Sequence, residues 1–244
     1  MNKITKIMAL NLLIGNVIAW NMGSAPIDFP VVAYSDQELQ LVTELAKDSS
    51  AKTELGALYS LHNELDKAEH LLSAALKSES DDPLAQAWLG ATRAKQAGAM
   101  FDPLMGLVKL YRLHGACADV NAAVAQAPDN FEVHMIRLAT FAPTNVINCS
   151  VETALKDEVW FKQFFAKQGK NAPLELKMQF NLAMSKAYVN IDNPQQATIY
   201  LNEFKQLAQG QKLSPSVEHE LAQATKLLGT VVNTSKTQQI GEHS

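Results

Sequence analysis

The amino-acid sequence predicts an all-α protein assembled from antiparallel helical hairpins. Of its 244 residues, 47% are apolar and 11 are glycine. Alanine, leucine, lysine and glutamine, which lose little rotamer freedom in a helix, recur throughout. Apolar residues repeat at helical spacing, and we find no period-two run of five or more residues that would indicate a strand. Small residues also recur at fixed distances, which lets two antiparallel helices approach closely.

The first hairpin carries the clearest pattern. One helix supplies a small residue, and the next supplies another 12 positions later, with apolar residues between them. This spacing resembles the tetratricopeptide-repeat (TPR) motif over residues 49–82, where five signature positions match: Leu55, Gly56, Tyr59, Ala68 and Ala75. Lys52 stands where tryptophan is common, and the closing proline comes late, at Pro83. The resemblance extends loosely to residue 210. It implies TPR-like hairpins stacked into a short right-handed superhelix, in an exported bacterial member of the family.

The second hairpin is longer than the motif allows. Its first small residue is Gly90 and the matching one is Ala116, so 26 positions separate them instead of 12. Fourteen extra residues correspond to about four helical turns, or two for each helix. We expect a turn near residues 98–102 and a break near His114 and Gly115.

The rest of the chain predicts two further hairpins and a closing helix. Ser150 is expected to cap a helix that runs to about residue 168 and contains four clustered aromatic residues. These either pack between neighbouring helices or form a partner-docking face. The last helix is expected over residues 214–228. The predicted TPR-like repeat domain therefore covers residues 35–228, and the polar residues 229–244 are expected to form a disordered tail.

The N-terminus has the three parts of a secretory signal peptide, which we assign to residues 1–25. Lys3 and Lys6 precede an apolar run over residues 7–20, and small residues follow it. The run is shorter than a membrane span, so an uncleaved anchor is the less favoured alternative. Residues 26–34 are expected to form an extended leader. The predicted location is periplasmic or secreted, with no stable membrane insertion after the signal is removed.

Two cysteines remain, Cys117 and Cys149. In an oxidising compartment they can form a disulfide, and closing this loop would stabilise the protein by about 3–4 kcal/mol in the chain-entropy model. The alternative is two buried thiols, because cysteine is among the most buried residue types.

The residues give no support for an enzyme. The net charge of −4 argues against a general affinity for nucleic acid. No phosphate-binding loop or nucleophile motif is present in the sequence. The histidines are not at metal-ligand spacing and are interpreted as surface or cap residues. We therefore predict no catalytic residues, no metal and no cofactor.

The resemblance also implies a binding surface. TPR domains generally bind through the concave surface lined by the first helix of each hairpin, and the partner implied here is a protein or peptide. The arginines, Arg137 among them, are expected to lie on the surface with their charged heads in water. The groove-facing positions fall on Thr53, Ala57, Ser60, Ala87, Ala91, Ala94, Lys95, Lys177, Phe180 and Met184.

Two functions remain open from the sequence. The favoured one is a non-enzymatic scaffold of the cell envelope whose groove binds a protein or peptide. The alternative is a small-molecule carrier, or less favoured an enzyme, with a pocket under the lengthened second hairpin.

Overall fold

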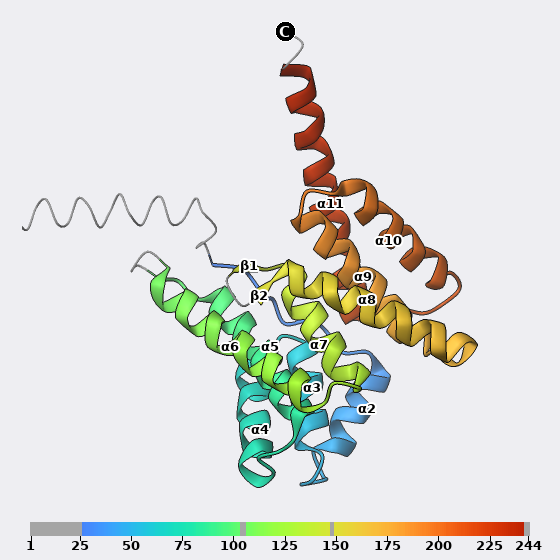
Figure 1. Ribbon diagram of the computed structural model, residues 1–244. Helices are drawn as coiled ribbons and strands as arrows, with labels where there is room; N and C mark the ends of the chain where they lie inside the picture. The colour runs from blue at the N-terminus through green and yellow to red at the C-terminus, as the bar shows by residue number, and fades with distance from the viewer. Residues whose placement is uncertain (1–25, 103–105, 147–148, 242–244) are drawn as a thin grey trace, which may run out of the picture.

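The computed structural model describes residues 26–102, 106–146 and 149–241. The predicted signal segment, residues 1–25, lies outside this range. Helix accounts for 76% of the described residues, which confirms the all-α fold class. Figure 1 shows the helices as a series of adjacent pairs, with α2 to α7 in one half of the molecule and α8 to α11 in the other.

The described elements follow one another in chain order with short connections. They are α2 (Asp36–Leu45), α3 (Lys52–Leu61), α4 (Leu65–Ser78), α5 (Pro83–Ala99), α6 (Leu107–Gln126), α7 (Phe131–Phe141), β1 (Asn145–Val146), β2 (Cys149–Ser150), α8 (Val151–Gln168), the 3-10 turn η2 (Gly169–Asn171), α9 (Leu174–Asn190), α10 (Pro194–Leu207) and α11 (Pro215–Gly241).

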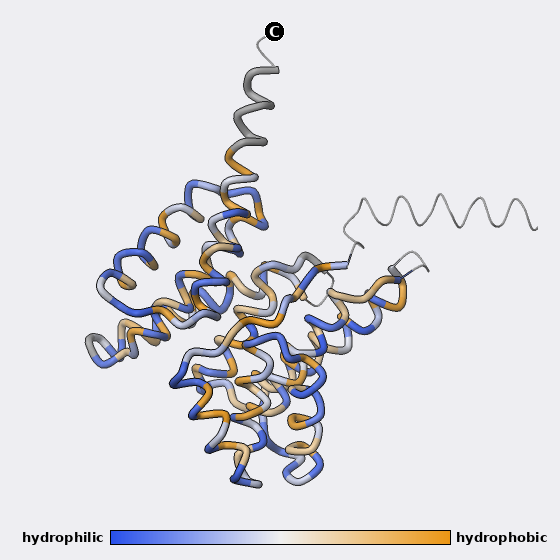
Figure 2. The backbone as a smooth tube through the Cα atoms, turned by 180° about the vertical axis from the view of Figure 1, so that it is seen from behind, coloured by the Kyte–Doolittle hydropathy of each residue, from blue (hydrophilic) through white to orange (hydrophobic). Residues whose placement is uncertain are grey.

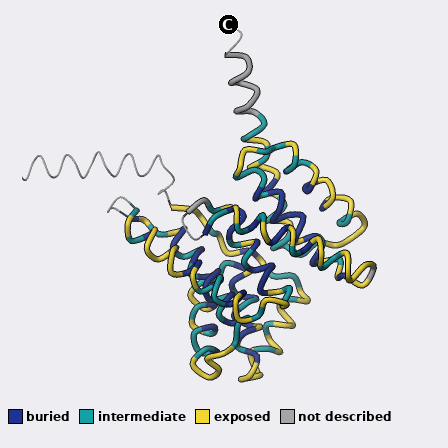
Figure 3. The backbone as a smooth tube through the Cα atoms, viewed as in Figure 1, coloured by how far each residue is buried: buried dark blue, intermediate teal, exposed yellow. Residues whose placement is uncertain are grey.

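Successive helices pack as hairpins. Helix α3 packs on α4, α5 on α6, α7 on α8 and α9 on α10, and the first helix of each hairpin also packs on the first helix of the next. The buried residues run along these contacts, as Figure 3 shows. The chain thus buries its apolar stripes between neighbours rather than in one central core.

Helix α2 begins where the sequence predicts. The Ser35 hydroxyl accepts a hydrogen bond from the Glu38 backbone N–H at 3.3 Å, and the Ser35 backbone N–H donates to Glu38 Oε2 at 2.7 Å. This reciprocal capping box satisfies two amide groups that have no partner within the helix.

The small residues lie where two helices touch. A Cβ on Gly56 would lie 2.7 Å from Leu72 Cγ, and one on Gly90 would lie 2.7 Å from the Ala116 carbonyl oxygen and 2.6 Å from Val120 Cγ2. A Cβ on Gly56 would also lie 3.5 Å from the Ala68 carbonyl oxygen, so each glycine meets the small residue that the sequence paired with it. The second pair is separated by 26 positions. Helices α5 and α6 are correspondingly longer than α3 and α4.

Two expectations about helix ends are wrong. Helix α6 runs without a break through His114 and Gly115, so Cys117 lies inside the helix. Helix α11 does not end at residue 228 but continues to Gly241. Neither segment contains proline, so every residue keeps the backbone N–H that a continuous helix needs.

A short hairpin of two strands connects α7 to α8 and carries one of the cysteines. Val146 pairs with Cys149 in register, and Cys149 forms a disulfide with Cys117 of α6, the two Cα atoms being 5.5 Å apart. The Thr144 hydroxyl donates to the Cys149 carbonyl at 2.6 Å. The disulfide thereby ties the second hairpin to the loop inside the third.

The two glycines of the lengthened hairpin should respond to alanine in opposite directions. Gly90→Ala should lower the free energy of unfolding by about 1–3 kcal/mol, because the new methyl group would collide with the α6 backbone. Gly115→Ala should raise it by about 0.5–1 kcal/mol, because nothing lies within 4 Å and alanine favours helix. Urea unfolding measures both changes in the free energy of unfolding. Equal effects of the two substitutions would contradict the close contact at Gly90.

Removing the disulfide should destabilise the fold. We expect the double variant Cys117→Ala/Cys149→Ala to lose about 3–4 kcal/mol of unfolding free energy, because the unfolded chain regains the entropy of an open loop. Thiol titration of the denatured, unreduced wild type is the companion measurement. Two free thiols in freshly isolated protein would show that the bridge does not form.

Candidate functional site

Most of the predicted groove residues are not available to a partner. Ala87 and Ala91 are buried against α6 and α7 side chains such as Val124. Phe180 and Met184 are buried in the largest apolar cluster, where Phe180 contacts Phe161 of α8 at 5.4 Å between ring centroids. These four positions therefore form helix–helix contacts and not an open groove.

The remaining groove positions are dispersed, with one exception. The Thr53 hydroxyl donates to Asp82 at 2.8 Å, and the Lys177 ammonium lies 3.4 Å from the Gly169 carbonyl oxygen. Ala94 is buried and Ala57 is half-buried. Ser60 and Lys95 come together: the Lys95 ammonium donates to the Ser60 carbonyl at 2.8 Å.

The Lys95 ammonium lies at the end of α3. Besides the Ser60 carbonyl it contacts Asn63 Oδ1 at 2.9 Å, so two of its three N–H groups have acceptors. Carbonyls in the last turn of a helix lack intrahelical partners, and a cation there complements the helix dipole. Both acceptors are neutral, and among the described residues no carboxylate lies within ion-pair distance of Lys95.

Two charged residues from the other half of the molecule act electrostatically on Lys95. The ammonium of Lys186, on α9, pairs with the carboxylate of Glu220, on α11. Burial lowers the pKa of Lys95 to about 8, with Glu220 opposing and Lys186 reinforcing the shift. Burial also raises the pKa of Glu220, but the Lys186 and Lys95 ammonium groups outweigh it and leave that pKa lowered. We call Lys95, Lys186, Glu220, Ser60 and Asn63 the Lys95 cluster.

The Lys95 cluster can bind an anion. Two lysines and one glutamate leave one net positive charge, and Lys95 has an N–H donor to offer. The side chain of Glu220 is 43% exposed while that of Lys186 is 12% exposed, so solvent reaches the cluster on the Glu220 side. A single carboxylate would neutralise the cluster and supply Lys95 with a charged acceptor.

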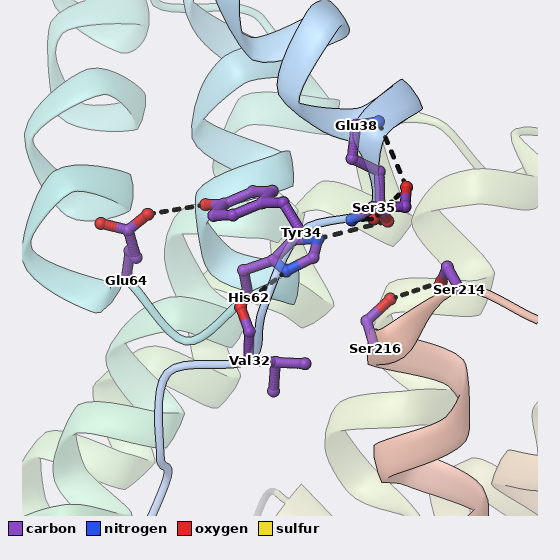
Figure 4. Close-up of polar contacts among 8 residues, drawn as sticks. All are labelled: Val32, Tyr34, Ser35, Glu38, His62, Glu64, Ser214 and Ser216. Carbon is purple, nitrogen blue, oxygen red and sulfur yellow. Dashed lines mark hydrogen bonds and ion pairs between the residues drawn. The ribbon is translucent and has the colours of Figure 1, made fainter.

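The leader is attached beside this cluster. The Asn63 amide donates to the Pro30 carbonyl at 2.9 Å, and Val32 N–H donates to the His62 carbonyl at 3.0 Å. Figure 4 shows the Tyr34 ring stacked on His62, with its hydroxyl donating to Glu64 at 2.7 Å. His62 is the C-cap residue of α3, one of the two roles expected for the histidines, but it is fully buried and does not lie on the surface. Its ring nitrogens lie near the Val32 carbonyl and the Glu38 carboxylate.

A second buried polar network was missed by the sequence analysis. Asp157, 1% exposed, accepts two hydrogen bonds from the Arg137 guanidinium at 2.5 and 2.9 Å and lies 2.9 Å from His134 Nδ1. Trp160 stacks on the His134 ring at 4.0 Å. Arg137 therefore does not hold its head in water. The i, i+3 spacing of His134 and Arg137 on one helix face was the available signal.

The aromatic residues of α8 pack between neighbours. Phe161 is fully buried, and Phe164 and Phe165 are partly buried against the same cluster. Next to them Glu158 accepts hydrogen bonds from the hydroxyls of Tyr188 and Tyr200. Burial and this carboxylate raise the pKa of Tyr188 to about 12, and they raise the pKa of Tyr200 as well. Both hydroxyls therefore keep their protons near neutral pH, and neither tyrosine is poised as a base. These contacts join α8 to α9 and α10.

Removing the charge of Asp157 tests whether its network holds α7 against α8. Asp157→Asn keeps the side-chain shape but leaves the Arg137 guanidinium without a buried counter-charge. We expect a loss of about 3–5 kcal/mol in unfolding free energy. The neighbouring, exposed Lys156→Gln serves as control and should stay within about 0.5 kcal/mol. A wild-type urea midpoint for Asp157→Asn would contradict the role of the network.

Among the described residues no group of three or more His, Cys, Asp or Glu side chains could hold a metal ion. None of the described helices combines the length and apolar character that crossing a membrane requires. Compared with known proteins, the chain matches no protein-family profile, no curated sequence and no solved structure.

Proposed function

We propose that this protein is a non-enzymatic, polypeptide-binding scaffold of the cell envelope, with TPR-like hairpins stacked into a short right-handed superhelix. Its binding site is the Lys95 cluster, and the partner presents an acidic segment there. The observation that carries the proposal is the Lys95 ammonium at the end of α3. Its two hydrogen-bond acceptors are neutral, and no carboxylate among the described residues lies within ion-pair distance, although Lys186 on α9 and Glu220 on α11 act on its charge.

The charge of the cluster selects the partner. The chain as a whole carries a net charge of −4, so the one positive charge of the cluster is opposite in sign to the net charge of the protein. An acidic side chain or a chain terminus can enter as a monoanion and pair with Lys95. A charge-assisted hydrogen bond in a partly desolvated site is stronger than one between neutral groups.

The openness of the site favours a polypeptide over a small molecule. Small-molecule pockets usually bury most of the ligand surface. Glu220 keeps 43% of its side chain exposed although it belongs to the cluster. Because the charged groups come from helices of three separate units, a segment lying across them would contact several units at once, which suits an extended peptide.

Binding of a carboxylate should take up a proton near pH 8. The pKa of Lys95 is lowered to about 8, and an added negative charge raises it again. At pH 8 the free site is therefore about half protonated and the bound site is fully protonated. Affinity should fall as the pH rises above 8, while little proton exchange should accompany binding near pH 6.5.

Charge variants of the full chain test this site. The probe is a fluorescein-labelled peptide of alternating leucine and glutamate, with a glutamine counterpart as control, measured by fluorescence anisotropy. Lys95→Gln, whose amide can still donate to the Ser60 carbonyl, should weaken binding about tenfold. Glu220→Gln should strengthen it, because it removes a competing negative charge.

Lys95→Gln is expected to lower the affinity for the peptide and Glu220→Gln to raise it. A loss of folding would lower the affinity in both variants. Equal affinity of wild type and Lys95→Gln, or equal binding of the glutamine peptide, would overturn the proposal. Recovery of a bound small acid from the purified protein, without peptide binding, would support the carrier alternative instead.

A further inference from the structure

Large apolar side chains are exposed at the tip of the lengthened second hairpin. On α6 the side chains of Leu107, Leu110 and Tyr111 are 60%, 46% and 79% exposed, and Phe101, on the other side of the turn, is 62% exposed. Figure 3 shows this end of α6 largely in the exposed colour, and Figure 2 shows apolar residues there. We call these four residues the hairpin tip.

The α6 members of the hairpin tip share one helix face. Leu107, Leu110 and Tyr111 are related by three and four positions, so their side chains lie one turn apart on the same side. Single exposed apolar residues are common on protein surfaces, but a group of them marks a contact surface. The extra residues of the second hairpin are therefore used to present an apolar face away from the core.

The chain leading to the N-terminal apolar run departs from the same end of the hairpin. Ile27 N–H donates to the carbonyl of Gly98, near the end of α5, at 2.9 Å. A Cβ on Gly98 would lie 3.2 Å from the Phe29 ring, so the leader packs directly on this glycine. The leader thus fixes the position from which the preceding residues extend.

The reach of that segment is short. Seven residue steps separate Trp20, the last residue of the apolar run, from Ile27. A fully extended chain covers at most about 25 Å over this length. Whenever residues 7–20 lie in a membrane, during export or afterwards, the hairpin tip is within about one bilayer thickness of the lipid surface.

We infer that the hairpin tip docks on the lipid bilayer, with its leucine and aromatic side chains in the interfacial layer. Tyrosine favours this layer because its ring is apolar and its hydroxyl can stay hydrated. Leucine and phenylalanine gain by leaving water, and an apolar helix face can lie in the interface without crossing the membrane. The inference does not depend on the Lys95 cluster, and either proposal can fail alone.

Photo-crosslinking of the full chain tests the occupant of this surface. Tyr111 is replaced by the photoreactive p-benzoylphenylalanine, and the protein is reconstituted with vesicles of phosphatidylethanolamine and phosphatidylglycerol. Residues 7–20 are retained in every variant, so any attachment that they give is common to all. The matched control carries the probe in place of Ile199 on α10, which is 49% exposed.

We expect mass spectrometry to find phospholipid adducts at position 111 and none at position 199. Adding Leu107→Ser and Leu110→Ser should lower the adduct yield at position 111 about tenfold, since two apolar anchors are lost. Urea unfolding of this variant should match wild type, because both side chains are exposed. Equal lipid adducts at both positions, or their absence at 111, would overturn the inference. In cells carrying the same probe, a polypeptide adduct in place of lipid at 111 would do so as well.

Discussion

The close contact between α5 and α6 at Gly90 is the constraint on which most of the molecule depends. A side chain at this position would meet the α6 backbone, so the two helices can approach only because glycine stands there. The contact fixes which residues face each other along both helices. It also fixes where the extra length goes, since nine residues of α5 follow Gly90 while five residues of α3 follow Gly56. The residues inserted between Gly90 and Ala116 therefore lie toward the turn that joins α5 to α6.

The register of α5 against α3 accounts for the Lys95 contact, and the extra length accounts for the hairpin tip. Lys95 lies five residues beyond Gly90, and Ser60 lies four residues beyond Gly56, so the two helices bring these groups together in register. Further along, the same helix reaches Gly98, on which the leader packs. The insertion thus supplies the projecting apolar tip, whereas Lys95 lies in the part of α5 that matches the length of α3.

The sequence predicted those features that depend on local spacing. The capping box at Ser35 and the pairing of Gly90 with Ala116 follow from helical geometry and from the space that a small residue leaves. The groove could not be predicted, because burial of Ala87 or Phe180 depends on how closely successive hairpins pack, and the motif does not specify that distance. Asp157 was also missed, since its partner Arg137 is 20 positions away and nothing local relates them.

The leader contacts both the Lys95 cluster and the end of α5. Asn63, whose side-chain oxygen accepts from Lys95, donates through its amide nitrogen to the Pro30 carbonyl. Its backbone is left-handed at φ 60°, a conformation that asparagine tolerates better than most residues. A single side chain thereby shares the cluster with the leader. The leader holds the Asn63 amide on one side, and this orients the Asn63 oxygen toward the Lys95 ammonium on the other. The position of the leader and the hydrogen bonds of Lys95 are therefore set by the same asparagine.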